Sequence, residues 1–162
     1  MATTQENMSR NDILQLVCFN LADEEYALDI HNVQEVMRVG QITHVPQMPE
    51  YCLGVMNIRG DVTAVFDLRK IFKLSAKEFD EDTRILAVTI KDTMVGLVVD
   101  EVLENMKLDS SNIDPTPEVR MNIERECIRG LGEVEGRMIV IMDLLRIHEY
   151  ILKSMESLRA NF

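Results

Sequence analysis

An internal repeat constrains the fold of this chain more than any single motif. Residues 26–36 (YALDIHNVQEV) align with residues 95–105 (VGLVVDEVLEN) at an offset of 69 positions, with apolar residues matched along both segments. At an offset of 70, Ile58-Arg59-Gly60 falls on Ile128-Arg129-Gly130. Two matches in the same order indicate two similar structural units in one chain.

The second half of each repeat ends in the same way. An apolar run closes in Asp67-Leu68 in the first copy and in Asp143-Leu144 in the second. With 162 residues in total, each copy alone would bury too little surface to be stable, so we expect the two units to share a core or an interface. A seam between two units is also a favoured place for binding.

Charge and apolar patterning exclude several classes of function. The chain has 28 Asp and Glu against 17 Lys and Arg, a formal net charge of -11, which disfavours binding to nucleic acid or to an anionic membrane surface. No targeting segment and no run of about 18 apolar residues is present, so we expect a soluble, cytoplasmic protein without membrane insertion. Cys18, Cys52 and Cys127 lie far apart in apolar surroundings and are expected to be buried thiols.

Short β-branched runs separated by turn residues dominate the chain and predict an all-β fold. Polar turns at Asp23-Glu24, Lys91-Asp92 and Glu135-Gly136 separate paired runs and favour hairpins in a small barrel or sandwich. The predicted strands number five in each half: 14–21, 25–30, 36–43, 53–58 and 62–67, then 84–90, 94–99, 102–107, 127–133 and 137–142.

The remaining segments complete the expected domain organisation. The polar stretch 73–83 predicts a linker between the units, and 109–125, with two prolines, predicts an exposed loop. Apolar residues at steps of three and four from Leu144 predict a C-terminal helix over about 144–160, which most simply packs on its own domain or else docks on a partner. We therefore expect a flexible segment 1–12, a first barrel at about 13–73 and a second at about 84–143.

No catalytic, metal-binding or phosphate-binding motif is recognisable. The three histidines lack ligand spacing, and the chain has no glycine-rich phosphate loop. Asp67 and Asp143 could be read as an acid–base pair, but each precedes a Leu after an apolar strand, as helix N-caps do. The sequence predicts neither an enzyme nor a cofactor.

Differences between the two copies point to candidate functional residues. At the offset of 70, Gly54 falls on Glu124 and Asn57 on Cys127, so these two residues are features of the first copy only. Alternatively, these differences have no functional meaning, and the sequence of one copy has simply diverged. Arg59 can hold a carboxylate in a bidentate manner, and Glu35 is its predicted partner.

Several segments together resemble the family of chemotaxis coupling proteins, CheW. The resemblance rests on EEYALDIHNVQEVM (24–37), PEYCLGVMNIRGDVTAVFDLRKIF (49–72), VGLVVDEV (95–102) and IRGLGEVEGRMIVIMDL (128–144), and it extends from Ile13 to the C-terminal tail, as a single CheW-like domain over 13–162. One departure is Ile58, where the family usually has Leu. The resemblance implies two packed, five-stranded SH3-like β-barrels and a non-enzymatic adaptor function.

The family resemblance also implies partners and docking residues. The partners would be the cytoplasmic tip of a methyl-accepting chemoreceptor, the regulatory domain of the chemotaxis histidine kinase and other CheW copies in array rings. Gly54 would belong to the kinase-binding surface, and Asn57 and Arg59 to the receptor- and array-facing surface. The groove between the barrels, which would take a receptor helix, is expected to involve Ile30, Val33, Glu35, Val98 and Val99.

Three alternatives remain open at this stage. A small hydrolase would use Asp67 or Asp143. A structural homo-oligomer would assemble through strand edges or the C-terminal helix. A CheW-like adaptor could also serve a pathway other than motility, and the sequence identifies neither the receptor nor its ligand.

Overall fold

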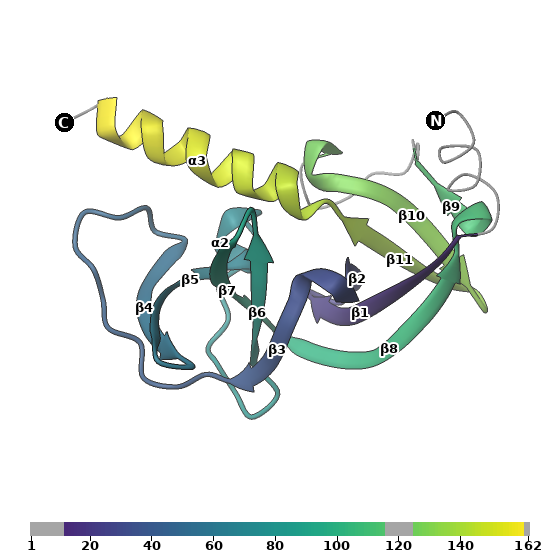
Figure 1. Cartoon of the computed structure of the whole chain (residues 1–162), viewed down its shortest axis with the longest axis horizontal. Helices are drawn as coiled ribbons and strands as arrows, with labels where there is room; N and C mark the ends of the chain where they lie inside the picture. Colours follow the sequence, from purple (N-terminus) through teal and green to yellow (C-terminus); the bar gives the residue numbers. More distant parts are fainter. Residues whose placement is uncertain (1–11, 116–124, 161–162) are drawn as a thin grey trace.

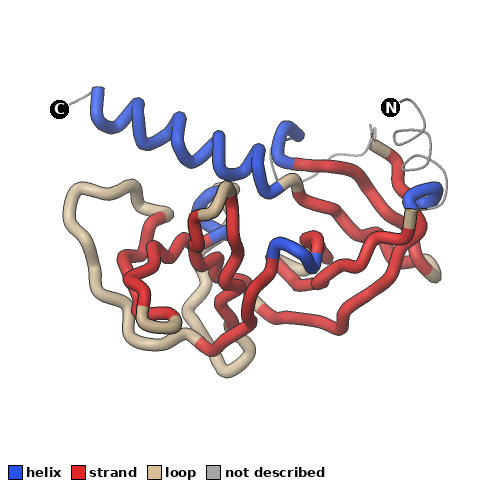
Figure 2. Tube along the Cα trace, viewed as in Figure 1, coloured by secondary structure: helices blue, strands red, loops and turns tan. Residues whose placement is uncertain are grey.

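The computed structural model describes residues 12–115 and 125–160, with the side chains of the C-terminal helix described as far as Lys153. The fold is mostly β, with two sheets side by side and one long helix, α3 (Leu144–Ala160), along one edge of both (Figures 1 and 2). The predicted all-β class with a C-terminal helix is confirmed. In the described part of the chain, no helix has the length and apolar character needed to cross a membrane.

The larger sheet has six strands rather than five. Its spatial order is β8-β1-β2-β11-β10-β9, antiparallel except between β2 and β11. The strands are β1 (Ile13–Leu21), β2 (Glu24–Asp29), β8 (Glu101–Asp109), β9 (Ile113–Asp114), β10 (Ile128–Val134) and β11 (Arg137–Met142). The two-residue β9 lies within the segment predicted to be a loop; residues 116–124 of that segment lie outside the described residues.

The smaller sheet has five strands in the order β3-β6-β7-β5-β4. It comprises β3 (Val33–Arg38), β4 (Cys52–Ile58), β5 (Asp61–Asp67), β6 (Arg84–Ile90) and β7 (Thr93–Val99), with α2 (Leu68–Ile71) after β5. A bridge from Thr43 to Val55 brings the chain after β3 back to β4 and closes the sheet into a barrel. The strand predicted at 36–43 therefore lies at 33–38. Of the predicted residues beyond 38, only Thr43 pairs with another strand.

The two sheets exchange hairpins between the halves of the chain. The β1–β2 hairpin pairs with β8 and β11 of the second half, and the β6–β7 hairpin pairs with β3 and β5 of the first half. The predicted boundaries of the barrels, 13–73 and 84–143, are thus wrong. They assumed that a unit of the repeat folds on itself, whereas each unit donates its first hairpin to the other.

The structure confirms the repeat but corrects its alignment in the second hairpin. The β1–β2 and β6–β7 turns, Ala22-Asp23 and Lys91-Asp92, match at the predicted offset of 69, and all four residues have positive φ. The β4–β5 turn at Arg59-Gly60 matches Glu135-Gly136 instead, again with positive φ at every residue and 76 positions further on. The match of Ile58-Arg59-Gly60 with 128–130 is coincidental, because the first triplet ends a strand and the second begins one.

The largest hydrophobic core is shared by both sheets. It takes buried side chains from β1, β2, β10 and β11 of one sheet, from β4 to β7 of the other, and from α2 and α3. Each sheet also has a small core of its own, of six buried residues in each case. The expectation of a shared core is confirmed, and most of the stabilising burial lies at the seam between the units.

Both predicted helix N-caps are present. The Asp67 carboxylate accepts a hydrogen bond from the Arg69 amide at 3.0 Å, and the Asp143 carboxylate accepts one from the Arg146 amide at 3.2 Å. Leu144, Ile147 and Ile151 bury the inner face of α3 in the shared core, so this helix packs on its own domain. All three cysteines are buried and free, as predicted.

Candidate functional site

The tip of the β4–β5 hairpin is a tight turn held by Asn57. The Asn57 side-chain oxygen accepts a hydrogen bond from the Gly60 amide at 2.9 Å, and Arg59 and Gly60 take φ values of 54° and 87°. Asparagine side chains commonly stabilise turns in this way. Asn57 therefore has a local structural role, while its side chain stays exposed.

The predicted contact between Arg59 and Glu35 is present. Arg59 Nε donates to Glu35 Oε2 at 2.9 Å, which joins the hairpin tip to the middle of β3. The two side chains are 59% and 36% exposed. An ion pair with this exposure contributes only about 0–1 kcal/mol to folding. The pair can therefore open toward a partner at little cost in stability.

An exposed apolar side chain lies on the same hairpin as Arg59. Val62 is opposite Asn57 in the β4–β5 register and is 76% exposed, the highest value among the large apolar residues of the described chain. Val36, next to Glu35 on β3, is 42% exposed. We use the name hairpin-tip patch for Glu35, Asn57, Arg59 and Val62. It combines one cation, one anion, one amide and one apolar group on an ordered turn.

The predicted seam groove is only partly accessible. Ile30 lies in the one-turn 3-10 helix η1 (Ile30–Asn32) between β2 and β3, and Val33 begins β3; both are half-buried against the shared core. Val98 and Val99 are 3% and 0% exposed and belong to the cores. Of the four apolar residues expected to line the groove, two reach the surface and two lie beneath it.

Gly54 is buried and cannot contact a partner directly. A Cβ atom at this position would lie 2.1 Å from the Thr43 carbonyl oxygen, and φ is +137°, a value that L-residues rarely adopt. The glycine sits at a bulge where the chain after β3 crosses β4. The structural counterpart of Gly54 is Gly130, at an offset of 76, and it sits at the corresponding bulge in β10. The proposal that Gly54 distinguishes the copies is therefore wrong, because it depended on the offset of 70.

Sequence reasoning missed a buried ion pair at the seam. Arg69, on α2, donates from Nε and Nη2 to the two carboxylate oxygens of Asp100 at 2.8 and 2.7 Å, with both side chains less than 15% exposed. Asp100 also accepts from the amide of Ala22 in the β1–β2 turn at 3.0 Å. This ion pair ties one sheet to the other. The DLR motif contained the arginine, but nothing in the sequence paired it with a residue 31 positions away.

The electrostatics of these carboxylates favour structural roles. Burial favours the neutral form of Asp100, but hydrogen bonds from Arg69 and Ala22 outweigh it and hold the pKa of Asp100 below its usual value. Burial raises the pKa of Asp67, which is 6% exposed and caps α2. Among the described residues, no group of three His, Cys, Asp or Glu side chains could hold a metal ion.

Comparison with known proteins gives the family and supports the fold. A family model, described as CheW-like domain, matches residues 15–151. The chemotaxis protein CheW of Helicobacter pylori is 35% identical over 142 residues, 88% of this chain and 84% of that protein. CheW of Klebsiella aerogenes is 32% identical over 82% of this chain and 80% of its own length. The crystal structure of the scaffolding protein TtCheW from Thermoanaerobacter tengcongensis gives a TM-score of 0.79 at 36% identity, covering 85% of this chain and 94% of that one.

The two-sheet β fold, shared with the crystal structure of a scaffolding protein, places this chain in the class of protein-docking scaffolds. Within this class the chain belongs to the CheW family, the adaptors that couple chemoreceptors to the kinase of bacterial chemotaxis. The family, the fold class and the adaptor function predicted from the sequence are confirmed at this level.

Proposed function

We propose that this protein links the cytoplasmic tips of chemoreceptors to the regulatory domain of a histidine kinase, in the cytoplasm and within receptor arrays at the membrane. The observation that supports this proposal is the hairpin-tip patch, where an exposed Glu35–Arg59 pair and an exposed Val62 lie on an ordered turn. Such a patch suits recognition of another protein, and the adaptor itself performs no chemistry.

The receptor tip docks, in this proposal, along β3. Ile30 and Val33 supply half-buried apolar surface at the seam, and β3 leads from there to Glu35. An amphipathic helix can lay its apolar side on such a strip and offer polar groups to Arg59. Arg59 then exchanges all or part of its contact with Glu35 for a receptor carboxylate. Val99 lies in the shared core beneath this strip, whereas Val98 faces the small core of the smaller sheet and contributes indirectly by packing β7.

The kinase regulatory domain docks on the strands around Gly54. Gly54 itself acts as a positioning residue, because only a residue without Cβ lets the Thr43 carbonyl cross β4. Contacts with the kinase then fall to outward side chains of the same strand, of which Leu53 and Val55 are partly exposed. Substitution of Gly54 would reduce kinase binding by displacing the strand and not by removing a contact.

Binding assays with purified receptor cytoplasmic fragment and kinase test this proposal. We expect Arg59→Ala combined with Val33→Glu to abolish receptor binding and kinase activation. The matched control is Met138→Glu, since Met138 occupies the position of Val62 at an offset of 76 and is 49% exposed. Unchanged receptor binding in the double variant would refute the assignment of this surface.

A pathway other than motility is the second candidate within the same class. Protein FrzA of Myxococcus xanthus is 29% identical over 64% of this chain and 64% of its own length, so related chains include proteins not named CheW. Deletion of the gene distinguishes the two cases. We expect loss of directed swimming with motility retained, and normal directed swimming would favour the other pathway.

A further inference from the structure

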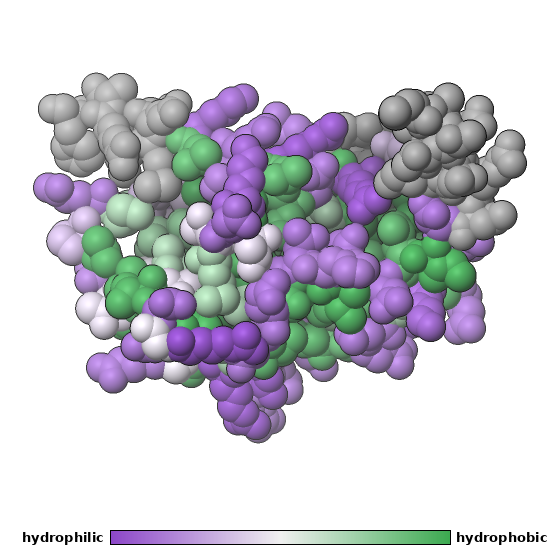
Figure 3. Space-filling view, in the orientation of Figure 1, coloured by the Kyte–Doolittle hydropathy of each residue, from purple (hydrophilic) through white to green (hydrophobic). Residues whose placement is uncertain are grey.

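The outer face of α3 carries an apolar pair that no part of the described chain covers. Leu145 and Leu152 are 50% and 45% exposed. Because they are seven residues apart, they face the same direction two helical turns apart, roughly 10 Å along the axis. Apolar patches interrupt the hydrophilic surface along the line of this helix (Figure 3). A different face of the helix, with Leu144, Ile147 and Ile151, packs in the shared core.

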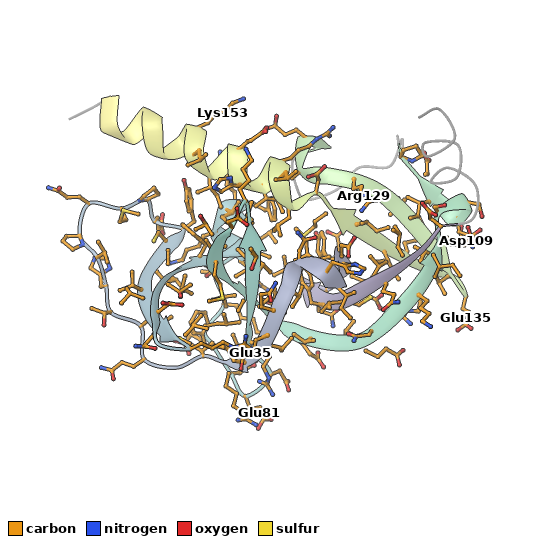
Figure 4. All side chains as sticks on the ribbon, in the orientation of Figure 1. Glu35, Glu81, Asp109, Arg129, Glu135 and Lys153 are labelled. Carbon is orange, nitrogen blue, oxygen red and sulfur yellow. The ribbon has the colours of Figure 1, made fainter. Side chains whose placement is uncertain are left out.

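Charged side chains flank this pair on one side. Arg146, Glu149 and Lys153 are all exposed and follow one another at steps of three and four. Arg146 is 56% exposed, and its two contacts are long: 3.6 Å from Nε to the Asp143 carboxylate and 3.5 Å from Nη1 to the Glu126 carbonyl. Lys153 points away from the body of the protein (Figure 4). These side chains are therefore available to a partner.

We propose that this face of α3 binds the same face of a second copy of this chain, with the two helices antiparallel. A two-fold axis near residues 148 and 149 places Leu145 against the partner's Leu152, and Leu152 against the partner's Leu145. The same axis brings Arg146 to within one helical turn of the partner's Glu149. Symmetry generates this contact twice, once on each side of the two-fold axis. The apolar and charged patterns are each self-complementary, which is the requirement of a symmetric dimer interface.

The position of the helix makes this dimer compatible with the adaptor function. Lys153 and Glu35 lie at opposite edges of the molecule, so a partner on α3 leaves the hairpin-tip patch uncovered (Figure 4). The contact involves about two helical turns and is small, which predicts a weak dimer that forms at high local protein concentration. The inference does not depend on the receptor-binding proposal, and its test uses neither receptor nor kinase.

Sedimentation equilibrium of the full chain, from about 10 µM to about 1 mM, tests the dimer. We expect the average mass to rise toward twice the monomer mass of 18.6 kDa. Leu152→Glu should hold the chain monomeric throughout, with an unchanged circular dichroism spectrum. Val62→Glu places the same charge on the hairpin-tip patch and should dimerise as the unmodified chain does. A monomer at every concentration, or equal dimerisation of Leu152→Glu, would overturn the proposal.

Charge reversal and crosslinking test the antiparallel arrangement. Glu149→Arg should weaken dimerisation at least tenfold, and Arg146→Glu added to it should restore most of the loss. Since the three native cysteines are buried, Glu149→Cys near the axis should form an intermolecular disulfide under mild oxidation. Gln34→Cys, an exposed position on β3, is the control. Failure of the double variant to recover, or equally fast crosslinking at position 34, would exclude this geometry.

Discussion

At the scale of single residues, two tightly constrained positions of the described chain are not surface contacts. Gly54 has no room for a Cβ atom, and Asp100 neutralises a buried guanidinium. Both hold the docking surfaces in place from within. Loss of function after substitution at such positions reports on the scaffold, so stability has to be measured beside binding.

Gly54→Ala should destabilise the protein severely. The methyl group would meet the Thr43 carbonyl oxygen at 2.1 Å in a backbone conformation that alanine rarely adopts, and we expect a loss above about 3 kcal/mol. Gly60→Ala is the matched control, because φ is +87° but nothing lies within 4 Å; it should cost about 1 kcal/mol. Urea unfolding measures both, and equal losses would show that the close approach is unimportant.

Asp100→Asn should remove a pH-dependent contribution to stability. Because the folded pKa of Asp100 is lowered, its ionised form stabilises the fold above the unfolded pKa, near 4, and this benefit is lost as pH falls through the folded value. We expect a cost of about 3 kcal/mol at pH 7, since Arg69 stays buried without its partner. The difference between variant and unmodified chain should shrink below about pH 4; a constant difference would contradict this assignment.

At the scale of elements, α3 seals the shared core with one face only. Ile147→Ala should cost about 3 kcal/mol, because the side chain is fully buried in that core. Leu145→Ala, two residues away on the outer face, should cost about 0.5 kcal/mol or less. Thermal unfolding of dilute protein compares the two without a contribution from dimerisation. Similar losses would mean that the outer face also packs within the monomer.

Local sequence patterns predicted the elements well and their partners poorly. Turn residues such as Lys91-Asp92 and the N-cap residues Asp67 and Asp143 act within a few residues, so they were recognisable. The Glu35–Arg59 contact was predicted by chemistry together with the repeat. The bond between Arg69 and Asp100, and the burial of Val98 and Val99, depend on which hairpin pairs with which sheet. No local pattern encodes that choice.

The alignment error in the repeat has a physical cause. Between the first and second hairpins the two copies differ in length by seven residues, the difference between offsets of 69 and 76. The coincidental match of Ile-Arg-Gly hid this insertion. Aligning the glycines at the two bulges, Gly54 with Gly130, would have given the correct offset of 76. Both positions need glycine for the same structural reason, because each lies at the corresponding bulge of its hairpin.

At the scale of the whole molecule, the exchange of hairpins makes the two units inseparable. Fragments 1–83 and 84–162 each contain a hairpin whose partner strands lie in the other fragment. Each fragment alone should be unfolded by circular dichroism, and mixing should restore the β spectrum in a one-to-one complex. A fragment that folds alone as a monomer would contradict the shared-core description.

The same exchange gives the molecule the form of a domain-swapped dimer joined into one chain by the segment 73–83. A symmetric dimer would present identical ends, but here the turns have diverged to opposite charge orders, Arg59-Gly60-Asp61 at one end and Glu135-Gly136-Arg137 at the other. Arg59 pairs with Glu35, whereas Arg137 pairs with Glu25 and approaches Glu104. The two ends of the molecule therefore have the same kind of hairpin turn but different charge patterns. A partner can distinguish them by charge, so the molecule can assemble in one defined direction.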